Sequence, residues 1–186
     1  MKKILPFILF IGLIACDTSE KKSSVQVSAD NEEMLSIYEN DQSDRLNGNI
    51  DWSIVSPRDE MRRSRVYEML DSGLVRTAND YHHAAMVFQH GSDSEAYGMA
   101  VKLIKKSLEL DSTSSRKKWL FAAATDRYLL STGAPQIYGT QYGKTSDDPV
   151  WRLRKLDSTQ ISDATRIEYG VETLAEQRER EKNMNK

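Results

Sequence analysis

Residues 94–108 read S-E-A-Y-G-M-A-V-K-L-I-K-K-S-L, and this stretch decides the fold class. Its small and apolar side chains recur at intervals of three and four, which is the spacing of one face of an α-helix. They form a single stripe that consists of Ala96, Ala100, Leu103, Ile104, Ser107 and Leu108. The stretch therefore predicts an amphipathic helix that begins near Ser94 and buries one face.

The segments on both sides of this stretch predict two more helices. Thr77 and Asp80 resemble a capping pair, and the helix that they open is apolar nearly all round and ends at Gly91. It is therefore expected to be central. The downstream helix begins after Ser115 and ends at Gly133, and its apolar face is formed by Trp119, Ala122, Ala123, Leu129 and Leu130.

These three helices resemble tetratricopeptide packing, with Ala100 at the small position where two helices cross. They span only about one and a half repeats, whereas a repeat stack needs about three to bury a continuous core. We therefore expect a tetratricopeptide-like helix hairpin inside a compact, mainly α domain, and not a solenoid.

Two helices are predicted upstream. The first runs from near Glu32 toward Arg45, with an apolar face formed by Met34, Leu35, Ile37 and Tyr38. The second is expected to open at Ser56-Pro57, a capping serine followed by proline at the first helical position, and to end at Gly73. Its predicted apolar face consists of Met61, Val66, Tyr67, Met69 and Leu70.

The character of the chain changes after Gly133. Residues 136–142 and 150–156 are β-prone and are separated by turn formers, which predicts a small two-stranded ribbon near residues 136–156. A last helix is expected from Ser162, with an interruption near Gly170. The single globular domain is predicted to span residues 31–175, and residues 176–186 are interpreted as a solvated, charged tail that frays.

The N-terminus carries the clearest functional signal. Residues 1–16 read M-K-K-I-L-P-F-I-L-F-I-G-L-I-A-C, a basic start followed by an apolar run. That run is shorter than the roughly 20 residues of a spanning helix and is typical of a secretory signal core. Residues 13–16 resemble the lipobox of bacterial lipoproteins. We expect removal of residues 1–15 as a signal peptide and attachment of a diacylglyceryl group, with palmitate among its acyl chains, to Cys16.

The alternative is an ordinary signal peptide followed by a chance cysteine, and it is disfavoured because Cys16 is the only cysteine. Residues 16–30 are then the lipidated cysteine and a flexible tether. This places the protein on a membrane of the bacterial cell envelope, facing the periplasm. Whether that is the inner or the outer membrane stays open.

Composition excludes some classes of partner. Charged residues make up 29% of the chain and the formal net charge is −2, and because cleavage removes Lys2 and Lys3 the mature chain carries 24 basic and 28 acidic residues, a net charge of −4. Lysine and arginine are scattered among acids, so no nucleic-acid surface is expected. The expected partners are the membrane, through the lipid, and an envelope protein or a small ligand.

The stretch from Ile137 to Asp148 resembles a phosphate-binding loop only superficially. A Walker loop has four residues between its glycines, whereas Gly139 and Gly143 are separated by three. The carboxylates that follow Lys144 would also repel phosphate. We therefore expect no nucleotide and no cofactor.

Three short motifs occur in a fixed order, namely Phe88-Gln89-His90, Asp126-Arg127 and Gly133-x-Pro135-Gln136-x-Tyr138-Gly139-Thr140-Gln141. They resemble an uncharacterised bacterial family that includes lipoproteins of flavobacterial type. The resemblance covers roughly residues 30–175 and extends weakly to Asp163-x-x-Arg166. The family has no assigned activity, so the resemblance implies a domain boundary and a candidate site but no reaction.

The motif residues define that candidate site. Helical spacing puts Asp126 and His90 on apolar faces, and a buried carboxylate or imidazole is costly unless it is partnered. We expect His90, Asp126 and Arg127 to converge with four candidate ligand-binding residues, Gln136, Tyr138, Thr140 and Gln141. The convergence is a structural network, a ligand pocket, or a catalytic site with His90 as base and Asp126 orienting it. The structural role is favoured.

Metal binding is not expected. His82 and His83 are adjacent and point about 100° apart on a helix, and no H-E-x-x-H pattern occurs. No serine or cysteine nucleophile stands in a recognisable motif. The favoured function is a lipid-anchored helical module that binds a ligand or partner, and the alternative is an envelope hydrolase that uses His90, Asp126 and Arg127.

Overall fold

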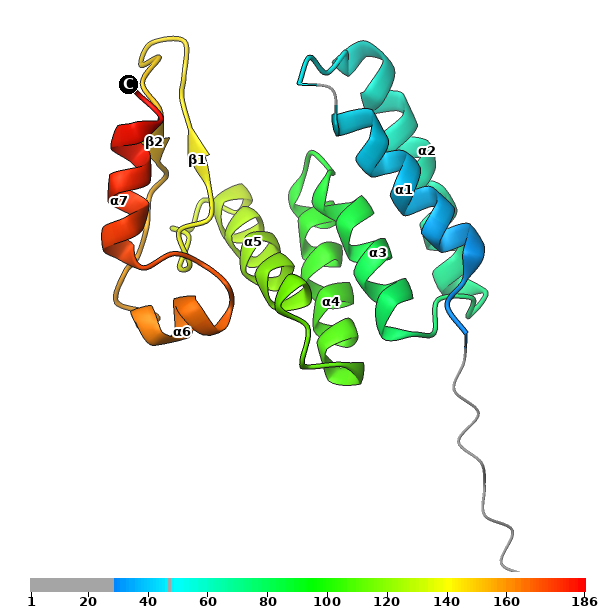
Figure 1. Cartoon of the computed structure of the whole chain (residues 1–186). Helices are drawn as coiled ribbons and strands as arrows, with labels where there is room; N and C mark the ends of the chain where they lie inside the picture. Colours follow the sequence, from blue (N-terminus) through cyan, green and yellow to red (C-terminus); the bar gives the residue numbers. More distant parts are fainter. Residues whose placement is uncertain (1–28, 47) are drawn as a thin grey trace, which may run out of the picture.

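The computed structural model describes residues 29–46 and 48–186, so the predicted signal peptide, Cys16 and most of the tether lie outside the described residues. In the described part, the chain forms seven helices and one two-stranded antiparallel sheet, which confirms the predicted mainly α class with a small ribbon (Figure 1). The helices are α1 Glu32–Leu46, α2 Trp52–Asp71, α3 Ala78–Gln89, α4 Ser94–Leu110, α5 Ser115–Ser131, α6 Asp163–Glu168 and α7 Leu174–Asn183.

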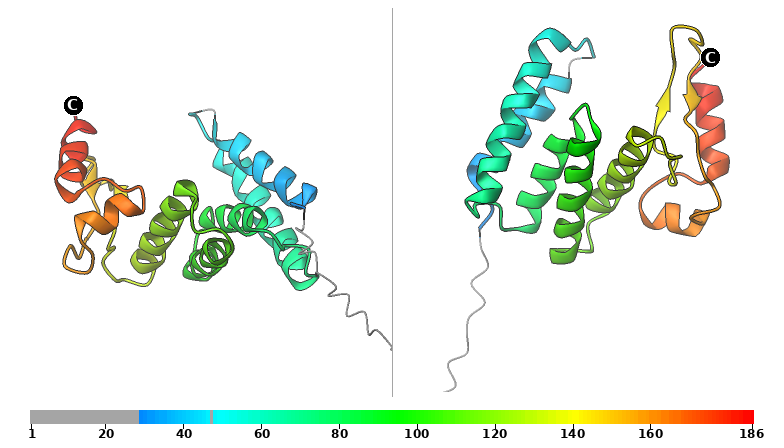
Figure 2. Two further views of the ribbon diagram at one scale, coloured as in Figure 1. Left: turned by 60° about the horizontal axis from the view of Figure 1, so that its bottom comes forward. Right: turned by 180° about the vertical axis from the view of Figure 1, so that it is seen from behind.

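The elements follow one another across the molecule in chain order (Figures 1 and 2). The α1–α2 pair lies at one end, α3, α4 and α5 occupy the middle, and the ribbon lies at the other end with α6 and α7. Helix α3 packs against α1, α2, α4 and α5 and is therefore central, as its apolar composition predicted. The fully buried residues of the main core are Met34, Val66, Met69, Ala84, Ala85, Phe88, Ala100, Ile104, Leu120 and Ala124.

Local signals place the middle helices. Thr77 and Asp80 form the predicted reciprocal capping box of α3. Asp93 caps α4 by accepting a hydrogen bond of 2.8 Å from the Ala96 amide. The predicted stripe of α4 is buried at five of its six positions, and Leu108 is half-buried. No helix of the described residues is both long and apolar enough to cross a membrane.

Helix α2 corrects two predictions. It begins at Trp52, not at Ser56, because the Asp51 carboxylate caps it by accepting from the Ser53 amide. Pro57 consequently lies inside the helix, where the carbonyl group left without a donor belongs to the exposed Ser53. Met61, assigned to the apolar face, is 73% exposed.

Helix α5 also differs from its predicted face. Trp119 is 46% exposed, and its neighbour Leu120 is fully buried in its place. The choice between two adjacent apolar residues is made by the packing of α5 against α4, because the helical period alone allows either to border the buried stripe.

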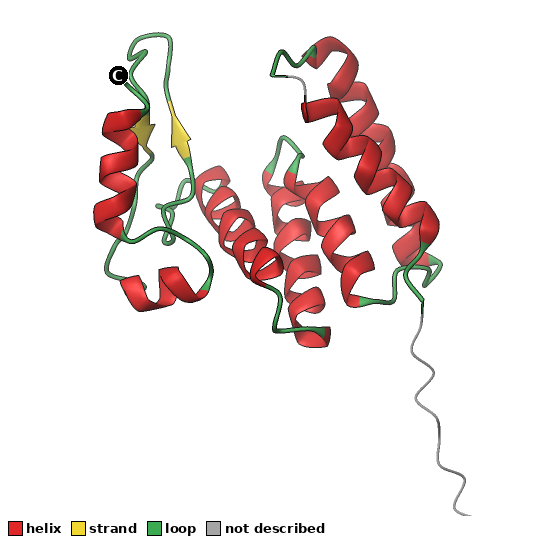
Figure 3. Ribbon diagram, in the orientation of Figure 1, coloured by secondary structure: helices red, strands yellow, loops and turns green. Residues whose placement is uncertain are grey.

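The ribbon is shorter than its β-prone residues predicted. Strand β1 spans Tyr142–Gly143 and β2 spans Arg152–Leu153, with Tyr142 opposite Leu153. An isolated bridge joins Gln136 and Leu156. Figure 3 shows that most of the chain between α5 and α6 is loop. Residues 137–140 cannot extend the ladder, because their amide groups bind a carboxylate instead.

The charged run at 176–186 is largely helical, contrary to the expected frayed tail. Thr173 and Glu176 form a capping box that starts α7. Gln177 is buried, and its amide donates hydrogen bonds of 2.8 Å to the carbonyl groups of Tyr138 and Glu172. One buried glutamine among exposed charges therefore anchors the helix to the ribbon.

Candidate functional site

Asp126 on α5 is the centre of a buried polar cluster. Its Oδ1 accepts hydrogen bonds of 2.9 Å from the amides of Ile137 and Tyr138, and its Oδ2 accepts bonds of 2.9 Å from those of Gly139 and Thr140. The Thr140 hydroxyl donates a fifth bond, at 2.8 Å. A carboxylate has about four lone-pair sites, so these donors leave none for a ligand. Asp126 organises the loop that surrounds it.

The carbonyl groups of the same loop are bound from the other side. Arg166 donates from Nε to the Tyr138 carbonyl at 3.2 Å and from Nη2 to the Ile137 carbonyl at 3.1 Å. Gln177 donates to the Tyr138 carbonyl as well. The resemblance had pointed weakly at Arg166. Nothing in the charged run that contains Gln177 could have distinguished it.

All four predicted ligand-binding residues have contacts within the fold. The Gln136 amide nitrogen donates to the carbonyl groups of Gln141 and Arg154, at 3.0 Å each, and its oxygen accepts from the Gln141 amide at 2.9 Å. Tyr138 is buried beside Phe121 and Tyr169, and this burial raises its pKa to about 12. Thr140 is bonded to Asp126. The Gln141 side chain connects the cluster to Arg127, because its nitrogen donates to the Thr140 hydroxyl at 2.9 Å and its oxygen accepts from Arg127.

His90 does not join Asp126. Its Nδ1 lies 2.8 Å from Oδ2 and 3.1 Å from Oδ1 of Asp41, a fully buried residue of α1. Asp41 also accepts hydrogen bonds from Arg45, at 3.1 Å, and from Gln42, at 2.8 Å. The expected pairing of His90 with Asp126 is therefore wrong, because a carboxylate from the first helix occupies that place.

Arg127 is largely buried and has only neutral hydrogen-bond partners. Its Nη1 donates to the Gln89 carbonyl at 2.7 Å and its Nε donates to the Gln141 side-chain oxygen at 3.2 Å. The guanidinium also lies against Tyr97, 6.0 Å from the ring centroid. Burial, with a smaller contribution from nearby Arg45, lowers the pKa of Arg127.

Other buried arginines contrast with Arg127. The side chains of Arg45, Arg62 and Arg166 are no more than 15% exposed, and each contacts a carboxylate. No carboxylate of the described residues lies within ion-pair distance of Arg127. Since a buried cation is ordinarily paired, this one lacks a counter-charge.

A cavity of about 310 Å³ brings Arg127 and His90 together. It lies between the α1–α2 loop, the end of α3 and α5, and it is lined by Arg45, Ile50, Trp52, His90, Gly91 and Arg127. Trp52 is 58% exposed and opens α2 at the cavity. The lining thus combines two guanidinium groups and an imidazole with the apolar side chains of Ile50 and Trp52. This cavity is the candidate functional site.

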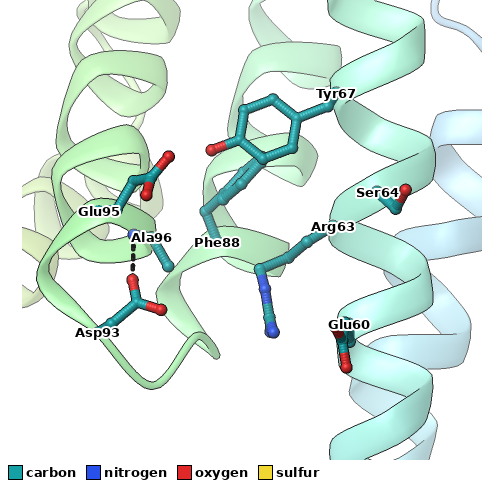
Figure 4. Close-up of a pocket in the computed structure, with 8 residues that line it drawn as sticks. All are labelled: Glu60, Arg63, Ser64, Tyr67, Phe88, Asp93, Glu95 and Ala96. Carbon is teal, nitrogen blue, oxygen red and sulfur yellow. Dashed lines mark hydrogen bonds between the residues drawn. The ribbon is translucent and has the colours of Figure 1, made fainter.

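A second cavity of about 300 Å³ lies between α2, α3 and the start of α4 (Figure 4). Its wall includes Phe88 and Tyr67, whose rings pack edge to face at 4.8 Å. Figure 4 shows acidic side chains around Arg63, and one of them, Asp93, is occupied as the cap of α4. Three carboxylates and one guanidinium line this cavity, so its net charge is negative and it would not attract an anion. It is the weaker candidate.

No protein-family model, curated protein or solved structure matches this chain. Membership of the bacterial family that the motifs resemble therefore stays a prediction. Within residues 29–46 and 48–186, no group of three or more metal-ligating side chains is placed to hold an ion. His83 instead stacks on Tyr38, with ring centroids 4.4 Å apart.

Proposed function

We propose that this protein is a lipid-anchored module of the bacterial cell envelope, facing the periplasm, that binds a small organic anion in the cavity beside Arg127. The observation that carries the proposal is the largely buried guanidinium of Arg127, which has no carboxylate partner. The lipid anchor is supported by the pattern of residues 1–16, which ends in the only cysteine of the chain.

The chemistry of Arg127 favours a carboxylate or a phosphate as ligand. A guanidinium removed from water without a counter-charge destabilises the fold, and a bound anion would remove that cost. Its planar donors match the two oxygens of a carboxylate or phosphate. Arg45 adds positive charge to the same cavity but contributes less, because Asp41 and Asp59 already pair with it.

The cavity also limits the size of the ligand. A volume of about 310 Å³ is at the low end of the range of roughly 300–1,000 Å³ for small-molecule pockets. Ile50 and Trp52 supply the apolar part of the lining beside the cations. The preferred ligand is therefore a compact molecule with one anionic group and a small apolar part.

Titration with acetate and with inorganic phosphate at constant ionic strength, followed by calorimetry, tests the proposal. Replacing Arg127 with glutamine should weaken binding by roughly 10- to 100-fold, because a hydrogen bond to a charged group is worth about 1.5–3 kcal/mol. Arg152→Gln is the matched control, since Arg152 is 60% exposed on β2 and does not line the cavity. Binding that is equally strong in Arg127→Gln would refute the proposal.

The anchor has its own test. Cys16→Ser should abolish incorporation of labelled palmitate and leave an unprocessed precursor. Unchanged acylation and membrane association in this variant would contradict the lipoprotein assignment.

A wider groove favours partner binding as a second candidate function. It has a volume of about 610 Å³, runs between α2, α3 and α4, and exposes the apolar side chains of Leu70 and Met99 beside three lysines. Lys102 and Lys105 form no ion pair within the described chain. The matching partner is an acidic segment of an envelope protein, in the manner of tetratricopeptide scaffolds. Loss of a cross-linked envelope partner after Lys102→Glu and Lys105→Glu would support it, and retention would exclude it.

A further inference from the structure

The Asp41–His90 pair has the geometry of a base and its orienting group. Asp41 is fully buried and bonds to Nδ1 of His90, so Nδ1 is the donor and the neutral ring has its lone pair on Nε2. Nε2 forms no hydrogen bond with any residue that the structure describes. The side chain is 17% exposed and lines the same cavity as Arg127.

Asp41 is itself held in place. Arg45 donates to its Oδ1 and also to its backbone carbonyl, at 2.9 Å, and the Gln42 amide donates to its Oδ2. The imidazole is thereby fixed in one orientation and one tautomer, which is what general base catalysis requires of its orienting group. One ring nitrogen is thus held by the buried carboxylate, and the other, in a residue that lines the cavity, has no partner in the described part of the chain.

We propose that His90 is a general base that activates water for hydrolysis of a small carboxylic ester bound in this cavity. This inference rests on the proposed function, because the carboxylate that Arg127 binds would be the product of the reaction. His90 is the catalytic residue, Arg127 stabilises the developing negative charge, and Asp41 is a positioning residue.

The reaction needs only water and the ester. His90 Nε2 takes a proton from water while the water oxygen bonds to the carbonyl carbon and the C=O π pair moves to the carbonyl oxygen. The Arg127 guanidinium stabilises that oxyanion. When the C=O bond re-forms, the bond to the alkoxy oxygen breaks, and the leaving alkoxide takes the proton back from Nε2. The products are a carboxylic acid, which ionises, and an alcohol.

The lining of the cavity favours direct attack by water. None of its six residues is serine, threonine or cysteine, so no side chain stands ready to form an acyl-enzyme. The apolar wall and the small volume suit short acyl groups. Hydrolysis should therefore proceed without a pre-steady-state burst of alcohol.

The test uses the full-length chain and p-nitrophenyl acetate, with release of p-nitrophenolate as the readout. His90→Gln should lower the rate at least about 100-fold, the typical contribution of a general base. His83→Gln is the matched control, because His83 stacks on Tyr38 and does not line the cavity. Acetate should inhibit the unmodified protein competitively, which tests the site without any substitution.

Asp41→Asn separates a positioning role from a structural one. Asp41 does not line the cavity, so Asp41→Asn should lower kcat and leave the KM for the ester nearly unchanged. A variant in which kcat falls and KM rises together would indicate a structural loss and would exclude the positioning role.

The outcomes distinguish the two proposals. If acetate binds but the protein hydrolyses the ester no faster than His90→Gln, the catalytic inference is overturned and the anion site stands. If neither acetate nor phosphate binds and acetate does not inhibit, both proposals fail. If His83→Gln loses as much activity as His90→Gln, the hydrolysis is not located in this cavity.

Discussion

Replacing Asp126 with asparagine is the most direct perturbation of this fold, because it changes one atom at the centre of five hydrogen bonds. The carboxylate accepts from four consecutive backbone amides and one hydroxyl. An asparagine in the same position keeps one oxygen and replaces the other with an NH₂ group. On that side, two backbone donors lose their acceptor and face another donor.

The cost follows from these two donors. A buried donor left unsatisfied destabilises by about 1–3 kcal/mol, so the pair costs about 2–6 kcal/mol. That is a large part of the roughly 5–15 kcal/mol by which native proteins are stable. For a chain of this size, each kcal/mol lowers the melting temperature by about 2–4 °C, which gives a decrease of roughly 5–20 °C.

Thermal and urea denaturation followed by circular dichroism measure this effect. Asp147→Asn is the matched control, because Asp147 is exposed in the ribbon loop and the chemical change is identical. Gln141→Ala and the double variant complete a cycle. Gln141 donates to the same Thr140 hydroxyl oxygen that serves Asp126, so the two effects should deviate from additivity by about 0.5–3 kcal/mol. An Asp126→Asn protein as stable as the control would refute a structural role for Asp126.

Three further predictions concern other parts of the chain. Gly139→Ala should destabilise the fold by more than Gly133→Ala. Both glycines have positive φ, of 89° and 83°, but a Cβ would collide with Gln177 only at Gly139. Urea titration of both variants measures the difference in the free energy of unfolding. Burial lowers the pKa of His82 from 6.5 to about 4, so between these values the unfolded chain binds more protons than the folded one. The free energy of unfolding therefore decreases as the pH falls, by up to about 1.4 kcal/mol per pH unit. Burial lowers the pKa of His83 as well, so the slope should be smaller in His82→Gln without vanishing, and a slope between pH 7 and pH 5 that is as steep as in the unmodified protein would contradict this. Lys144→Ala should change stability by no more than about 0.5 kcal/mol, and a magnesium-dependent stabilisation by ATP that this variant abolishes would restore the phosphate-loop interpretation.

Local signals in the sequence predicted the helices well. The stripe of α4 and the capping box of α3 depend on residues three and four apart, so the sequence contains all of the relevant information. The start of α2 was misplaced because the sequence has two possible N-cap residues, Asp51 and Ser56, and the structure uses Asp51. The length of the strands was overpredicted because the backbone amides of residues 137–140 donate to the Asp126 carboxylate and not to a neighbouring strand.

The candidate site was predictable only in part. Helical spacing predicted that Asp126 is buried, but four of its five donors are backbone amides. Every residue except proline has such an amide, so the residue types of the loop do not identify these donors. The partner of His90 lies 49 positions upstream in α1, whereas Asp126 lies 36 positions downstream. Spacing gives no means of choosing between two such distant carboxylates, and the packing of α1 on α3 decides the matter.

Asp126 and Arg127 are adjacent on α5 but have different roles. Asp126 has the structural role and Arg127 has the proposed binding role, on different sides of the helix. Neighbours on a helix point about 100° apart, so Asp126 faces the loop while Arg127 faces the cavity. Gln141 connects the two sides, because its backbone belongs to the loop ordered by Asp126 and its side-chain oxygen accepts from Arg127. Asp126, whose lone pairs are all occupied, can therefore position the guanidinium of Arg127, which has no counter-charge. Because the loop around Asp126 is rigid, it fixes Gln141, and Gln141 sets the direction in which Arg127 faces the cavity.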